Sequence, residues 1–230
     1  QLHAGLLLVR GGQELRGAEV VRKLARATLT HQTDPGPLFA GASKALEAAL
    51  EVTRRARLPR WMQLELQVPL VLAGMYTSPA FSKRYAFDTI ASLQHVLGLA
   101  QESSADGALD AGALRAVLSR APLLDPGESA TPDTPDLVTL VGWLIRSVMS
   151  TVGTAAAAID HETQERAAKA LRPFDVFGRE HPAAAAYEYC RLVISMTEGH
   201  PAASHAGWTD LLSRLPGLAY DGDDPDGFMT

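Results

Sequence analysis

The chain has 230 residues, of which 47% are apolar and 6% aromatic, and its formal net charge is −5. This length and composition allow a hydrophobic core that needs no disulfide or metal to hold it together. The single cysteine, Cys190, excludes an intrachain disulfide framework and a multi-cysteine zinc site, so the cytoplasm is the expected compartment.

The first segment has the only strand-like pattern in the chain. The run GLLLV (5–9), the Gly11-Gly12 pair and QEL (13–15) follow one another. Two glycines between apolar runs favour a tight turn between antiparallel strands. We therefore expect a short β-hairpin at the N-terminus beside the helices.

The rest of the chain predicts helices. Alanine is abundant, apolar residues recur at helical spacing, and Pro, Gly or Asp-rich breaks separate the segments. Helices are expected over 18–30, 37–57, 60–75, 79–100, 110–121, 161–172, 182–198 and 207–214, with a central helix beginning at Leu137. The expected fold class is all-α, a multi-helix bundle of about eight helices.

Residues 26–31, RATLTH, resemble a short motif of HEPN ribonucleases, which are helical. That motif is an arginine followed by a histidine at a short spacing, and the polar residue usual after the arginine is here Ala27. Because the chain holds 17 arginines and seven histidines, such matches arise by chance. We assign no family, and Arg26 and His31 stay candidates for a catalytic alternative.

The densest basic stretch is TRRARLPRW (53–61), and SKRYAF (82–87) adds to it. Arginines beside aromatic rings suit pairing with phosphates and stacking on bases. The alternatives are that the arginines stabilise a helix C-terminus and that the rings belong to the core. The residues expected to form this binding surface are Arg54, Arg55, Arg57, Arg60, Trp61, Lys83, Arg84 and Tyr85.

Residues 122–136, PLLDPGESATPDTPD, are the best candidate for a linker or surface loop, because they contain four prolines. They separate an N-terminal helical region, 1–121, from a C-terminal helical region, 137–230. Residues 1–121 hold 14 basic and 10 acidic residues, a net +4, whereas residues 122–230 hold 7 and 16, a net −9. This asymmetry makes the basic half the expected binding half.

The segment beginning at Leu137 is apolar enough to raise the question of a membrane span. Its apolar residues follow the spacing of one helix face, and the opposite face carries polar residues that include Arg146. An arginine near the middle of a lipid-exposed helix is unfavourable. We therefore expect a core helix and no membrane.

His161 and Glu165 lie four residues apart, so on a helix they share a face that can hold a metal. Two ligands do not make a site, and acidic residues at a helix start also stabilise its dipole. The simpler interpretation is a helix N-terminus, and no metal is expected. The metal alternative stays open as part of the catalytic one.

The remaining candidate residues are better explained by structural roles than by catalysis or metal binding. Cys190 falls in an apolar helical stripe, which predicts a structural thiol. His200 and His205 lack carboxylate or cysteine partners at ligand spacing. The acidic tail, 221–226, has Asp226 where a calcium loop requires glycine, so calcium is not expected.

These patterns together predict a non-catalytic, self-associating α-helical binding protein. Its basic surface is expected to contact nucleic acid or an acidic partner. The alternatives are a helical enzyme, either HEPN-like or with a histidine and carboxylate metal site, and a ligand-sensing helical bundle. The sequence contains no phosphate-binding glycine loop or dinucleotide fingerprint, and no cofactor is expected.

Overall fold

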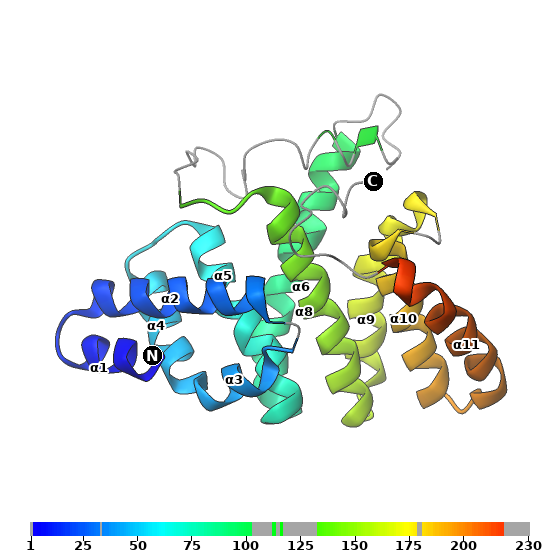
Figure 1. Cartoon of the computed structure of the whole chain (residues 1–230), viewed down its shortest axis with the longest axis horizontal. Coiled ribbons are helices and arrows are strands. Elements are labelled where there is room, and N and C mark those ends of the chain that lie inside the picture. Colours follow the sequence, from blue (N-terminus) through cyan, green and yellow to red (C-terminus); the bar gives the residue numbers. More distant parts are fainter. Residues whose placement is uncertain are drawn as a thin grey trace. The chain divides into compact units, whose positions relative to one another are not determined.

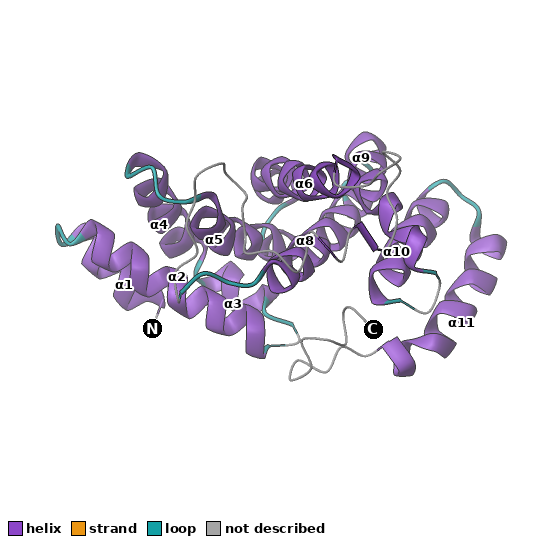
Figure 2. Ribbon diagram, turned by 90° about the horizontal axis from the view of Figure 1, so that it is seen from above, coloured by secondary structure: helices purple, strands orange, loops and turns teal. Residues whose placement is uncertain are grey.

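The computed structural model describes residues 2–32, 34–102, 112, 113, 116, 133–178 and 181–218 (Figure 1). In these residues the protein is all-α and contains no strand (Figure 2). The all-α prediction is therefore confirmed. The predicted helix 110–121 and the acidic tail lie almost wholly outside the described residues.

The chain forms two compact units, Gln1–Thr89 with Pro122–Pro135 and Ile90–Ala121 with Asp136–Thr230. The chain passes between the units three times: within helix α6 (Pro79–Glu102), between Ala121 and Pro122, and between Pro135 and Asp136. The separation expected at 122–136 stays a prediction, because most of that segment is not described.

The first unit is built on helix α2, which packs against α1, α4 and α5. Its buried side chains include Val21, Phe39, Leu46 and Leu64. Its elements are α1 (Leu2–Arg10), α2 (Glu14–His31), α3 (Gly36–Gly41), α4 (Ser43–Arg55), α5 (Arg60–Leu72), the 3-10 helix η1 (Ala73–Tyr76) and the beginning of α6.

The expected N-terminal hairpin is wrong, because that segment forms α1 and the start of α2. Gly12 has a φ of 84°, and the Gln13 N–H bonds to the Leu8 carbonyl across it, which ends α1. The glycine pair is therefore a helix terminus. The two helices then pack closely, since a Cβ on Gly17 would lie 2.6 Å from the backbone nitrogen of Val9.

The second unit holds the most apolar helix of the described chain. Helix α8 packs against α9 and α10, and α10 also packs against α11. Its elements are the rest of α6, α8 (Leu137–Ala157), α9 (His161–Leu171), the 3-10 helix η2 (Arg172–Phe177), α10 (Pro182–Thr197) and α11 (Pro201–Leu218).

Two aspartates set the starts of α8 and α9. Asp136 accepts hydrogen bonds from the backbone N–H and the hydroxyl of Thr139, at 2.7 and 2.9 Å. Asp160 binds Thr163 in the same way, at 3.1 and 2.8 Å. Each side chain satisfies donors that the first turn leaves free, and the two helices begin where the sequence predicts them, at Leu137 and at residue 161.

Helix α8 is the one described helix that is long and apolar enough to cross a membrane. Within its most apolar window, 67% of the residues are buried inside the protein. Leu140, Val141, Leu144 and Val148 are fully buried. Such burial is that of a core helix, as its sequence pattern predicts.

Candidate binding surface

The predicted basic residues come from the end of α4, from the turn and the start of α5 that follow it, and from the start of α6. Arg54 and Arg55 end α4, Arg57 lies in the following turn, and Arg60 begins α5. The others, Lys83 and Arg84, lie near the start of α6. We call Arg54, Arg55, Arg57, Arg60, Lys83 and Arg84 the arginine surface.

Asp88 of α6 joins the basic ends of α4 and α5. Its Oδ2 lies 2.8 Å from Nη2 of Arg54 and also accepts a hydrogen bond of 2.8 Å from Nε2 of Gln67. Its backbone carbonyl accepts a 3.2 Å bond from Nη2 of Arg60. One acidic residue thus holds three donors from two helices in a fixed arrangement.

The other paired arginines meet carboxylates that are partly exposed to solvent. Arg55 lies 3.3 Å from Glu14 and 3.7 Å from Glu51, and Arg84 lies 3.8 Å from Glu47. Exposed ion pairs of this kind contribute at most about 1 kcal/mol each. An incoming anion can therefore replace these carboxylates at small energetic cost.

Arg57 differs from the other arginines in its backbone. Its φ is 51°, in the left-handed region that glycine adopts without strain. The Arg57 and Leu58 N–H groups bond to the carbonyls of Arg54 and Thr53, which closes α4 with a Schellman motif. Within the described chain, no ion pair or hydrogen bond of its side chain is recorded, and the residue is exposed.

The two aromatic rings expected on this surface are buried, so this part of the prediction is wrong. Trp61 is 2% exposed and Tyr85 is 3% exposed. The Tyr85 hydroxyl donates a 2.6 Å bond to Oε1 of Glu47, and burial followed by this bond raises the pKa of Tyr85 to about 12. The rings fill the core, and neither is placed to stack on a base.

A buried ion pair lies between α2 and α5, which the sequence did not predict. Glu65 is fully buried, and its Oε2 lies 2.6 Å from Nη1 of Arg22. The Arg22 guanidinium also lies 5.2 Å from the centre of the Trp61 ring. Burial raises the pKa of Glu65, and Arg22 and Arg26 act in the opposite direction.

The nuclease candidates Arg26 and His31 do not meet at a site. Because Arg26 and His31 are five residues apart on one helix, their side chains point in directions about 140° apart around its axis. Arg26 donates a hydrogen bond to the backbone carbonyl of Asp133 and lies 3.4 Å from Glu65, whereas His31 is exposed at the end of α2. The two side chains therefore do not face a common site.

The metal candidates are exposed at the start of α9. His161 and Glu165 both point into solvent, and Asp160 beside them caps the helix. In the described part of the chain, no three His, Cys, Asp or Glu side chains gather as a metal site would require. The geometry agrees with the simpler interpretation of a helix N-terminus.

Cys190 lies inside the second unit, where its residue is 0% exposed. Burial raises the pKa of its thiol to about 12, so the reactive thiolate is disfavoured. His181 caps α10 by accepting a 3.1 Å bond from the Ala183 N–H. The predicted structural role of Cys190 fits this placement, and His200 and His205 are exposed.

Comparison with known proteins gives no indication of function, so the function is argued from the geometry of the structure. No protein-family model matches the chain. No curated protein and no solved structure shows significant similarity to it.

Proposed function

We propose that the protein is a non-catalytic α-helical binding module whose arginine surface binds an acidic segment of a protein partner. The observation that carries this proposal is Arg57. It occupies a helix end where glycine is the unstrained choice, and it projects an exposed charge that forms no ion pair with any residue that the structure describes.

The helix ends of the same chain supply the comparison for Arg57. Gly12 and Gly199 stand at the equivalent positions after α1 and α10, with φ of 84° and 83°. A residue with a side chain in this conformation loses about 1 kcal/mol relative to glycine. Ile159 takes the same conformation after α8 with an apolar side chain, so backbone strain alone does not mark a binding residue, and the proposal rests on the exposed positive charge that Arg57 places there.

An acidic protein segment fits this surface better than nucleic acid does. Trp61 and Tyr85 are buried, so base stacking is not supported. Carboxylates are interspersed among the arginines, and a continuous row of phosphates would meet them at close range. A protein partner can match such a mixed pattern with its own alternating charges.

Self-association is proposed on the charge difference between the two sequence halves. The net +4 of residues 1–121 and the net −9 of residues 122–230 allow head-to-tail contact between copies. Light scattering at low and high salt measures it. A monomer at every salt concentration would contradict this part of the proposal.

The experiment measures binding of a labelled oligo-glutamate peptide and of labelled DNA and RNA at about 50 and 200 mM salt. Wild type is expected to bind the peptide at the lower salt, and Arg57→Gly to bind it several-fold more weakly. Ile159→Gly is the control, because it relieves the same backbone strain at the end of α8 without removing a charge.

The outcomes separate the partner classes. Charge reversal of Arg54, Arg55 and Arg57 to glutamate is expected to abolish peptide binding. Tighter binding of nucleic acid than of the peptide would instead assign the surface to phosphates. Equal affinity of wild type and the triple variant for every probe would remove the arginine surface as a binding site.

A further inference from the structure

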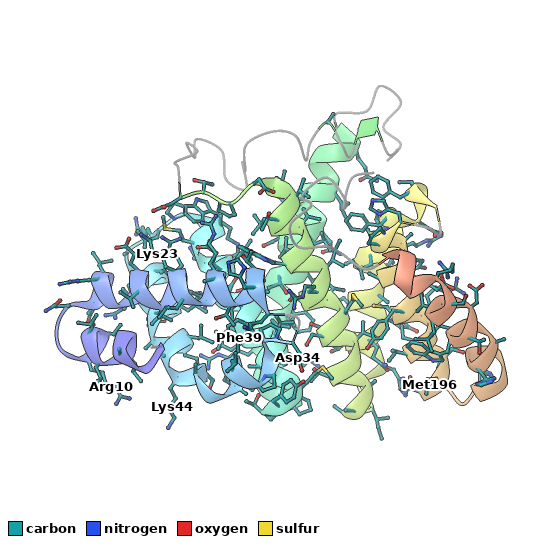
Figure 3. The ribbon with its side chains drawn as sticks, viewed as in Figure 1. Arg10, Lys23, Asp34, Phe39, Lys44 and Met196 are labelled. Atoms are coloured by element: carbon teal, nitrogen blue, oxygen red, sulfur yellow. The ribbon has the colours of Figure 1, made fainter. Side chains whose placement is uncertain are left out.

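Residues 133–135, called the segment below, are held against α2 by two cations that contact Asp133. The carbonyl oxygen of Asp133 accepts a hydrogen bond from Nη1 of Arg26, and its carboxylate lies 3.7 Å from Nζ of Lys23, which Figure 3 labels. The first unit ends two residues later, at Pro135. We call Lys23, Arg26 and Asp133 the clasp.

Arg26 also faces the buried Glu65. Its Nη1 lies 3.4 Å from Oε1 of Glu65, but among the described residues no donor makes a hydrogen bond to that oxygen. The other oxygen, Oε2, is bonded to Arg22. The same Arg26 nitrogen therefore faces two acceptors, and it makes a hydrogen bond to one of them.

We propose that Arg26 is a two-position switch that donates either to the Asp133 carbonyl or to Oε1 of Glu65. In the closed position the segment is fixed to α2. In the open position Arg26 completes the hydrogen bonding of the buried carboxylate, and the segment is released. The switch thus controls where the chain leaves the first unit, just before α8.

Nη1 carries two N–H groups, but in this position only the bond to the Asp133 carbonyl is made, so completing the bond to Glu65 requires the guanidinium to shift. A buried carboxylate oxygen without a donor is unfavourable, which drives Arg26 toward Glu65. The attraction between Lys23 and Asp133 favours the closed position, but both side chains are more than half exposed. Salt screens such a pair far more than it screens a buried one, so salt is expected to open the clasp.

Hydrogen exchange of the whole chain tests the switch. Asp133→Asn and Lys23→Gln are each expected to speed amide exchange several-fold from residue 134 to 140. Exchange in α5 around Glu65 is expected to stay unchanged, because Arg26 then bonds to Glu65. Glu19→Gln is the control, since it removes the other carboxylate partner of Lys23, at 3.0 Å, and leaves the segment in place.

Arg26→Gln distinguishes a switch from an ordinary contact. This variant is expected to speed exchange both in the segment and in α5, because Glu65 then loses its second cation. Faster α5 exchange in Asp133→Asn would overturn the proposal, since it would show that Arg26 does not move to Glu65. Unchanged exchange of the segment in Asp133→Asn and Lys23→Gln would overturn it as well.

Salt supplies an independent measurement. Raising the salt concentration from about 50 to about 500 mM is expected to speed segment exchange in wild type several-fold. The same change is expected to leave Asp133→Asn nearly unaffected. If wild type and Asp133→Asn respond to salt equally, the response does not come from the clasp, and the proposal is contradicted.

Discussion

Arg57 and Ile159 occupy the same position at the ends of two different helices. Each is the left-handed residue of a Schellman motif, with φ of 51° and 57°. At Ile159 the N–H groups of Ile159 and Asp160 bond to the carbonyls of Ala156 and Ala155. The motif normally favours glycine, and a branched side chain there is strained.

Glycine at either position is therefore expected to stabilise the protein. Ile159 is 76% exposed, so Ile159→Gly removes strain and few buried contacts. We expect Ile159→Gly and Arg57→Gly each to raise the free energy of unfolding by about 0.5–1 kcal/mol. Urea unfolding measures the change, and a loss of stability in either variant would refute the strain argument.

The two N-terminal helices give a second prediction, on close packing. A Cβ on Gly17 would lie 2.6 Å from the Val9 nitrogen and 2.8 Å from the Gly5 carbonyl oxygen. Because both are backbone atoms, α1 and α2 must separate to accept it. We expect Gly17→Ala to lower the free energy of unfolding by about 1–3 kcal/mol.

Gly142 in α8 provides the matched control for Gly17. A Cβ there meets no atom of another described element within 4 Å, so we expect the alanine variant to change mainly helix propensity. Gly142→Ala is expected to raise the free energy of unfolding by about 0.5–1 kcal/mol. Chemical denaturation of both variants checks the pair. Opposite signs are expected, and equal effects would contradict close packing of α1 on α2.

Helix positions were largely predictable from the sequence because their signals are local. Asp136 and Asp160 precede apolar helical patterns and do cap helices. The N-terminal turn was misjudged because a glycine pair suits both a hairpin and a helix end. The predicted helix 37–57 breaks at Ala42, where φ is −108°, and no Pro or Gly marks that residue itself.

The candidate site was predictable only in part, because burial depends on tertiary packing. Trp61 and Tyr85 lie beside arginines in the sequence, yet their rings turn into the core. Glu65 reads as a polar break in an apolar run, and its partner Arg22 comes from another helix, 43 residues away. The left-handed backbone of Arg57 has no sequence signal at all.

Cys190 gives a prediction on reactivity. Its buried thiol has a pKa raised to about 12, so the thiolate is scarce at neutral pH and the sulfur is covered. We expect the folded protein to react with an aromatic disulfide reagent at least about a hundredfold more slowly than the urea-unfolded protein. Equal rates in the two states would show that Cys190 is accessible.

The buried carboxyl of Glu65 gives a prediction on pH. Its pKa is raised in the folded protein, mainly by burial, so the folded state holds the proton more tightly than the unfolded state. The stabilisation that comes from this tighter proton binding is therefore complete below pH 4.5, the ordinary pKa. It is lost as the pH rises through the higher pKa of the folded state. We expect wild type to lose stability relative to Glu65→Gln over this range.

Urea unfolding of both proteins between about pH 4 and pH 7 measures this difference. Glu65→Gln is the suitable comparison, because glutamine keeps the shape of the side chain and removes its titration. A difference that grows in favour of wild type with rising pH would show that Arg22 and Arg26 outweigh burial. That result would place the folded pKa of Glu65 below its ordinary value.

Arg22 and Glu65 give the last prediction, on a buried pair. Arg22→Met leaves the Glu65 carboxylate without its 2.6 Å partner, with Arg26 as the remaining cation at 3.4 Å. Removing one member of a buried pair is expected to lower the free energy of unfolding by about 3–5 kcal/mol. The double variant Arg22→Met with Glu65→Leu removes both charges, so we expect it to recover most of that loss. Additive losses in the double-mutant cycle would mean that the two side chains act independently, which the contact between them contradicts.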